Sequence, residues 1–105
     1  MSDREYELLD LAAKFSNRNG SKIECPDDLD GTYVSRSPLR SGYVWNPLED
    51  DGDAMRLAML VGFEECIPYI RGSLEAAAVH PVSCRLKATR LAITLAAAEQ
   101  EKLLR

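Results

Sequence analysis

The sequence predicts an α+β domain in which three helices pack with a small antiparallel sheet in a sandwich-like arrangement. Apolar residues recur at helical spacing near both ends and in the middle of the 105-residue chain. Short β-prone runs, bounded by Gly, Pro, Asn, Asp and Ser, lie between these segments. An apolar fraction of 46% and a charged fraction of 29% are typical of a globular domain. We therefore expect residues 1–105 to form one domain, with the order helix, three strands, helix, two strands, helix.

The first predicted helix covers residues 3–17. Ser2 is its expected N-cap, and Glu5 follows three residues later as the reciprocal partner of a capping box. The apolar stripe has the spacing i, i+3, i+4 and i+7 and consists of Leu8, Leu11, Ala12 and Phe15. The run 17–20 ends in Gly20 and supplies residues that tolerate the left-handed conformation at a helix end.

Residues 21–45 are expected to form two or three short strands of an antiparallel meander. Alternating or β-prone residues occupy 22–25, 32–35 and 43–45, and turn-forming residues separate them. Aromatic residues in or beside these strands serve either as core and sheet-face residues or as anchors of a protein interface. The candidate binding-surface residues, here and further along the chain, are Tyr33, Arg36, Arg40, Tyr43, Tyr69 and Arg71.

The acidic segment in the middle of the chain combines an aromatic residue, a Pro turn and a cluster of acids. It does not fit an EF-hand loop, because Gly52 at the sixth position would place Pro47 first and Ala58 twelfth, where acids are required. Helix capping explains the acids better, since Asp50 or Asp51 can accept hydrogen bonds from the first turn of a following helix. The motif, which we interpret as structural, comprises Trp45, Asn46, Pro47, Asp50, Asp51, Gly52 and Asp53, and Trp45 is expected to pack under that helix.

The remaining elements follow from residue 51 onward. A helix is predicted over 51–61, and Gly62 is a suitable residue to end it. Residues 63–79 are predicted as a hairpin, in which Pro68 restricts the first strand to an edge or a bulge. The second half of this segment has good helix propensity, but its shortness between two turn signals favours a strand. The last helix is predicted over 82–103, where apolar residues and alanines recur at helical spacing.

Composition restricts the classes of partner. A formal charge of −4 and a pI near 5.0 argue against nucleic-acid binding, which needs a clustered basic face. A local basic patch formed by Arg36, Arg40 and Arg71 stays open. The start of the chain lacks the apolar segment of a secretion signal, and no apolar run is long enough to cross a bilayer. We expect a cytoplasmic protein that does not associate with membranes.

Three cysteines and one histidine are the other reactive side chains. Cys25, Cys66 and Cys84 form neither an even set nor a CxxC pair, which favours free thiols in a reducing compartment. Together with His80 they include the ligand types of a zinc site, but their spacing is not that of a zinc motif. His80 also has no identifiable catalytic partner, and no glycine-rich phosphate motif occurs. We therefore expect no catalytic residue, no cofactor and no metal.

Three segments carry a family resemblance. WNPLEDDGDAMRLA at 45–58 resembles the WNPL-x-DDGDALRLA segment of a family of small uncharacterised phage and prophage proteins. DREYELLDLAAK at 3–14 looks like the opening helix of that family, and ATRLAI at 88–93 looks like its closing ATRRAI helix. Residues 63–82 depart from the family pattern. The resemblance implies a phage α/β/α sandwich domain and carries no catalytic assignment.

These observations lead to one leading hypothesis and two alternatives. We expect a non-enzymatic phage or prophage accessory protein that binds a host or phage protein in the bacterial cytoplasm. Inhibition of a host defence system would fit its size and charge, which makes it an anti-CRISPR candidate. The first alternative is a homo-oligomeric structural or regulatory module, such as a homodimer in which the alanine-rich last helix pairs across a two-fold axis. The second is a small metal-dependent enzyme that uses the acids of 49–53.

Overall fold

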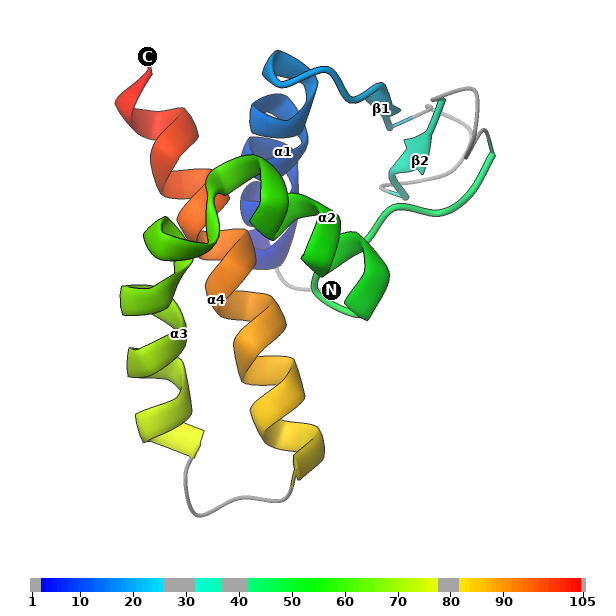
Figure 1. The fold of residues 1–105 in the computed structure, drawn as a ribbon. Coiled ribbons are helices and arrows are strands. Elements are labelled where there is room, and N and C mark those ends of the chain that lie inside the picture. Colours follow the sequence, from blue (N-terminus) through cyan, green and yellow to red (C-terminus); the bar gives the residue numbers. More distant parts are fainter. Residues whose placement is uncertain (1–2, 26–31, 37–41, 78–81, 105) are drawn as a thin grey trace.

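The computed structural model describes residues 3–25, 32–36, 42–77 and 82–104, which contain four helices and a two-stranded antiparallel sheet (Figure 1). The elements are α1 (Asp3–Arg18), β1 (Ile23–Glu24), β2 (Val34–Ser35), α2 (Asp51–Val61), α3 (Phe63–Ala77) and α4 (Val82–Leu103). The α+β class is confirmed, although helices predominate. Within the described ranges the sheet is too small to form the predicted sandwich.

The last helix is the element against which the others pack. α4 contacts α1, α2 and α3, and Figure 1 shows α3 beside the N-terminal part of α4. Small side chains allow this close approach, and the buried alanines of α4 are Ala92, Ala96, Ala97 and Ala98. Because these alanines are buried inside the protein's own core, they are not available for the two-fold pairing that the sequence suggested.

The three helices predicted over 3–17, 51–61 and 82–103 are confirmed, each to within one residue at its ends. α2 ends where expected, because Gly62 has a φ of 101° and its backbone N–H bonds to the carbonyl of Ala58 at 2.8 Å. The predicted Ser2 cap of the first helix lies outside the described residues.

The hairpin predicted over 63–79 is wrong, because α3 occupies Phe63–Ala77. Gly62 reverses the chain direction, and its carbonyl accepts the first backbone hydrogen bonds of α3 from Glu65 and Cys66. Pro68 is tolerated inside the helix because it lies on an exposed face, where water can satisfy the carbonyl that its missing N–H leaves free. Cys66 is fully buried and Ile70 packs against the same core, so helical spacing overrode the local β propensity.

The predicted meander is present in a reduced form. Its register places Ile23 opposite Ser35 and Glu24 opposite Val34. The third strand is represented only by an antiparallel bridge between Val34 and Val44 in the described part of the chain. The Trp45 N–H donates to the carbonyl of Tyr33 at 2.8 Å, so the chain stays paired until it reaches the acidic segment.

An ion pair between a half-exposed arginine and a buried carboxylate joins the C-terminal ends of α1 and α4. The side chain of Glu101 is 1% exposed, and its two oxygens accept hydrogen bonds from Nε of Arg18 at 2.6 and 3.0 Å. The hydrogen bond and the charge of Glu101 raise the pKa of Arg18 above its ordinary value. A buried carboxylate needs such a partner, so this contact fixes where the two helices meet.

Two glycines provide a direct test of the α2–α3 connection. Gly62→Ala should lower the free energy of unfolding by about 1–3 kcal/mol, because its φ of 101° is strained for any residue with a Cβ. Gly72→Ala should raise it by roughly 0.5–1 kcal/mol, because Gly72 lies inside α3 with no atom within 4 Å of an added Cβ. Urea denaturation of both variants measures these differences. Destabilisation by Gly72→Ala would favour a turn at this position and contradict the helix.

Candidate functional site

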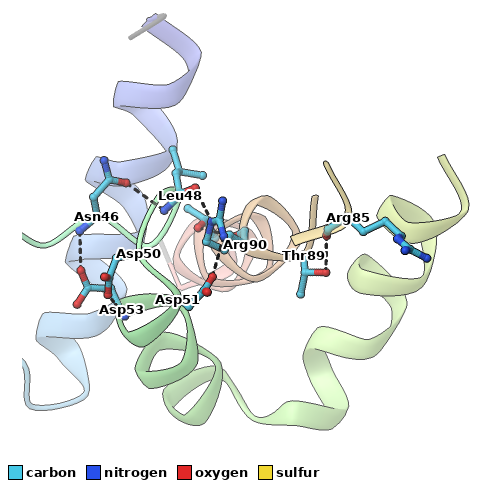
Figure 2. Close-up of polar contacts among 9 residues, drawn as sticks. Asn46, Leu48, Asp50, Asp51, Asp53, Arg85, Thr89 and Arg90 are labelled. Carbon is cyan, nitrogen blue, oxygen red and sulfur yellow. Dashed lines mark hydrogen bonds and ion pairs between the residues drawn. The ribbon is translucent and has the colours of Figure 1, made fainter. Parts of the chain in front are cut away.

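The acidic segment forms a joint between the meander and α2, which Figure 2 shows. Asp53 lies in the first turn of α2 and is 2% exposed. Its Oδ2 accepts a hydrogen bond from the N–H of Asn46 at 2.9 Å, and its Oδ1 accepts one from Nη2 of Arg56 at 2.7 Å. Trp45 is buried in the same cluster as Leu57, which confirms that it packs against this helix. Asp53 thus fixes the chain just after Trp45 to α2.

Two further side chains shape the turn into α2. Asp50 is the N-cap, and its Oδ2 accepts a hydrogen bond from the N–H of Asp53 at 2.8 Å, which confirms the capping prediction. Asn46 Oδ1 accepts from the N–H of Leu48 at 3.0 Å and closes a local turn. The direction of α2 is therefore set by side chains of the motif itself.

Arg90 of α4 holds the outer side of this joint (Figure 2). Its Nη1 lies 2.7 Å from Oδ1 of Asp51, and its Nε donates to the carbonyl of Leu48 at 3.0 Å. Sequence reasoning did not identify this residue, because Arg90 occupies an ordinary polar position of a helix far along the chain. No local pattern could have indicated a contact across 39 residues.

The carboxylates of Asp50, Asp51 and Asp53 therefore all accept hydrogen bonds or ion pairs from other groups of the protein. Each interaction has a structural role: capping, an ion pair to α4 and the link to Asn46. In the described part of the chain, no group of three His, Cys, Asp or Glu residues could hold a metal ion. The arrangement supports the structural interpretation of the motif.

An open groove of about 530 Å³ lies beside the joint. Its lining residues are Glu5, Asn46, Leu48, Glu49, Lys87, Ala88 and Leu91. The lining thus combines both signs of charge with apolar side chains.

The predicted binding residues of the meander have different roles. Tyr33 is structural: its hydroxyl donates to Oδ1 of Asp10 at 3.3 Å, and its ring lies edge-on to Trp45 with centroids 6.1 Å apart. Arg36 is exposed and pairs with Glu24, with 3.2 Å between Nε and Oε2. Tyr43 is exposed, and Arg40 lies outside the described residues.

The other two candidates, Tyr69 and Arg71, lie on α3. Both are exposed, and Figure 1 shows α3 and the strands on opposite sides of the molecule. The predicted residues therefore do not form one surface, and Arg36 and Arg71 do not gather into the basic patch that the sequence left open.

The thiols that the structure describes differ in accessibility. Cys25 is exposed, whereas Cys66 is fully buried, and burial followed by the charge of Glu65 raises the pKa of its thiol. Both are free, as expected. The side chain of Cys84, and His80, lie outside the described part.

One surface was missed at the sequence level. Large apolar side chains are exposed along two consecutive helices, and we call them the α2–α3 face: Met55, Met59, Phe63, Ile67 and Leu74. Met59 is 65% exposed and Phe63 is 55% exposed. The spacing of four residues from Met55 to Ile67 was a usable signal, but the assignment of strands after Gly62 concealed it.

A series of alanine substitutions should separate the roles of the acids. Asp53→Ala should lower the free energy of unfolding by about 1–3 kcal/mol, because it leaves the part-buried N–H of Asn46 without its acceptor and removes the ion pair with Arg56. Asp50→Ala should cost about 1 kcal/mol through loss of the cap. Asp51→Ala should cost less than about 1 kcal/mol, since the Asp51 carboxylate is 72% exposed and Arg90 keeps its hydrogen bond to the carbonyl of Leu48. Thermal or urea unfolding checks this order, with exposed Glu49→Ala as the control; equal costs at all sites would contradict it.

The phenol of Tyr33 should ionise at a higher pH than an ordinary tyrosine. Burial, followed by the charge of Asp10, raises its pKa from 10.0 to about 12. Because the folded-state pKa lies above the unfolded value, its contribution to stability is fully present below pH 10 and is lost as the pH rises from 10 to about 12. An ultraviolet absorbance titration should show one late transition that Tyr33→Phe removes. A titration curve whose high-pH part is the same in the wild-type protein and in Tyr33→Phe would contradict the contact.

None of the described helices is long and apolar enough to span a membrane. Comparison of the chain with protein-family models, with curated proteins and with solved structures finds no match.

Proposed function

We propose that the protein is a non-enzymatic binding protein that contacts another protein through the α2–α3 face. The observation that carries this proposal is the series of exposed apolar side chains along α2 and α3, with Met59 65% and Phe63 55% exposed. Single exposed apolar residues are ordinary, but several along neighbouring turns mark an interaction surface. Methionine side chains adapt their shape to a partner, which suits Met55 and Met59 to such a role.

The packing of the two helices supports this assignment. Leu57 and Leu60 of α2 line a small internal pocket together with Trp45, so Met55 and Met59 occupy the opposite flank, away from the meander. α3 packs on α4 and meets α2 only near Gly62, which leaves its outer flank uncovered by the described chain. A partner that covers this flank would remove Phe63 and Ile67 from water.

The kind of partner is suggested by the motif. Because WNPLEDDGDAMRLA resembles a segment of phage proteins, a host or phage protein is the expected target, and inhibition of a host defence system stays a prediction. The alternative of a metal-dependent enzyme is less well supported, since Asp50, Asp51 and Asp53 already accept hydrogen bonds or ion pairs from the protein.

Site-specific photo-crosslinking in the bacterial host tests the proposal. A benzophenone side chain at Met59 or Phe63 should give discrete protein adducts, because it would lie inside the interface. The same group at Leu103, which is 79% exposed near the end of α4, is the matched apolar control and should give none. A third position, Tyr43, tests the meander surface that the sequence favoured.

The adducts distinguish the outcomes, because mass spectrometry identifies the crosslinked protein. Adducts from Met59 and Phe63 alone would support the α2–α3 face. Adducts from Tyr43 alone, or equal yields from Leu103, would overturn it.

A further inference from the structure

The outer flank of α3 carries the pattern of a helix that pairs with another helix. Phe63, Ile67, Ile70 and Leu74 recur at intervals of four, three and four residues, which is the spacing of the two apolar positions in a heptad. Three of them are open to solvent, with Phe63 55%, Ile67 46% and Leu74 36% exposed, while Ile70 is partly buried against the core. The described chain therefore leaves this seam mostly uncovered.

The charges beside the seam indicate which partner it fits. Glu64 and Arg71 each follow an apolar residue of the seam directly, so they occupy the same position of successive heptads. Both are exposed, and neither forms an ion pair within the described residues. An antiparallel copy of α3 would bring each Glu64 against the partner's Arg71, twice by symmetry. In a parallel copy Arg71 would face the position of Cys66, which carries no charge, so this ion pair would not form.

The neighbouring helix is also incomplete in this region. Leu86 lies seven residues before the buried Ile93, and therefore on the same side of α4, yet it is 48% exposed. The α3–α4 pair thus has apolar side chains near its loop end that no other described element covers. Two such pairs related by a two-fold axis would form a four-helix arrangement that covers them.

We propose that the partner of the α3 seam is a second copy of this chain, bound antiparallel across a two-fold axis. This inference rests on the proposed function, because it names the protein that the α2–α3 face contacts. It differs from a dimer through the alanines of α4, which are buried inside each copy. The two-fold axis passes near Ile67, midway between Glu64 and Arg71 along the helix.

Sedimentation equilibrium of the full chain tests the pairing. The wild-type protein should be a dimer, and Ile67→Asp should be a monomer with an unchanged helical circular dichroism spectrum. Glu64→Arg or Arg71→Glu alone should each weaken the dimer roughly tenfold, because each creates two repulsive contacts. The double variant Glu64→Arg/Arg71→Glu should restore it. Glu65→Arg is the matched control: it changes the same charge one residue further along α3, off the seam, and should leave the dimer intact.

The outcomes separate this inference from the proposed function. A monomeric wild-type protein overturns the second copy as partner, and an adduct of Phe63 with a different protein would then leave the proposed function standing. Equal weakening by Glu65→Arg, or no rescue by the double variant, overturns the antiparallel arrangement. A monomer that also gives no specific adduct from Met59 or Phe63 overturns both proposals.

Discussion

The buried carboxylate of Asp53 determines how the meander is joined to α2. Asp53 accepts hydrogen bonds from the Asn46 N–H and from Arg56, and the first of these connects the end of the meander to the start of α2. Asp50 caps the same helix, so the chain enters α2 in one direction. That direction places Leu57 against Trp45 and turns Met55 and Met59 toward solvent. The location of the candidate binding face therefore depends on a contact that is remote from it.

Small and polar residues of α4 determine how the other helices pack against it. Alanines of α4 allow three helices to approach one helix, and the polar contacts of Arg90 and Glu101 set two of these approaches along its length. Arg90 fixes the turn before α2, whereas Glu101 fixes the end of α1. α3 has no hydrogen bond or ion pair of this kind to α4 among the described side chains, and it is held by apolar packing around Cys66 and Ile70.

The sequence predicts the helices that carry their own boundary signals. Asp50 and Gly62 mark the ends of α2, and the long alanine-rich stripe identifies α4. α3 was not predicted because Pro68 and Gly72 are residues that usually interrupt a helix. Both are exposed inside α3, and the packing of the helix around Cys66 and Ile70 outweighs their cost. The candidate site was predicted in part: the capping acids were identified, but Arg90 was not, because ion pairs between distant segments leave no local pattern. The exposed face could not be predicted while its second half was assigned to strands.

The dependence of α1, α2 and α3 on α4 has a consequence for folding during synthesis. The residues that precede α4 cannot complete their core until Ala92, Ala96 and Ala97 have been made, because these side chains lie in the same buried cluster. The contact between Arg18 and Glu101 spans 83 residues and forms only after α4 has been made. Nascent chains therefore expose the apolar faces of α1, α2 and α3 until α4 leaves the ribosome, and such exposed faces are the surfaces that chaperones bind.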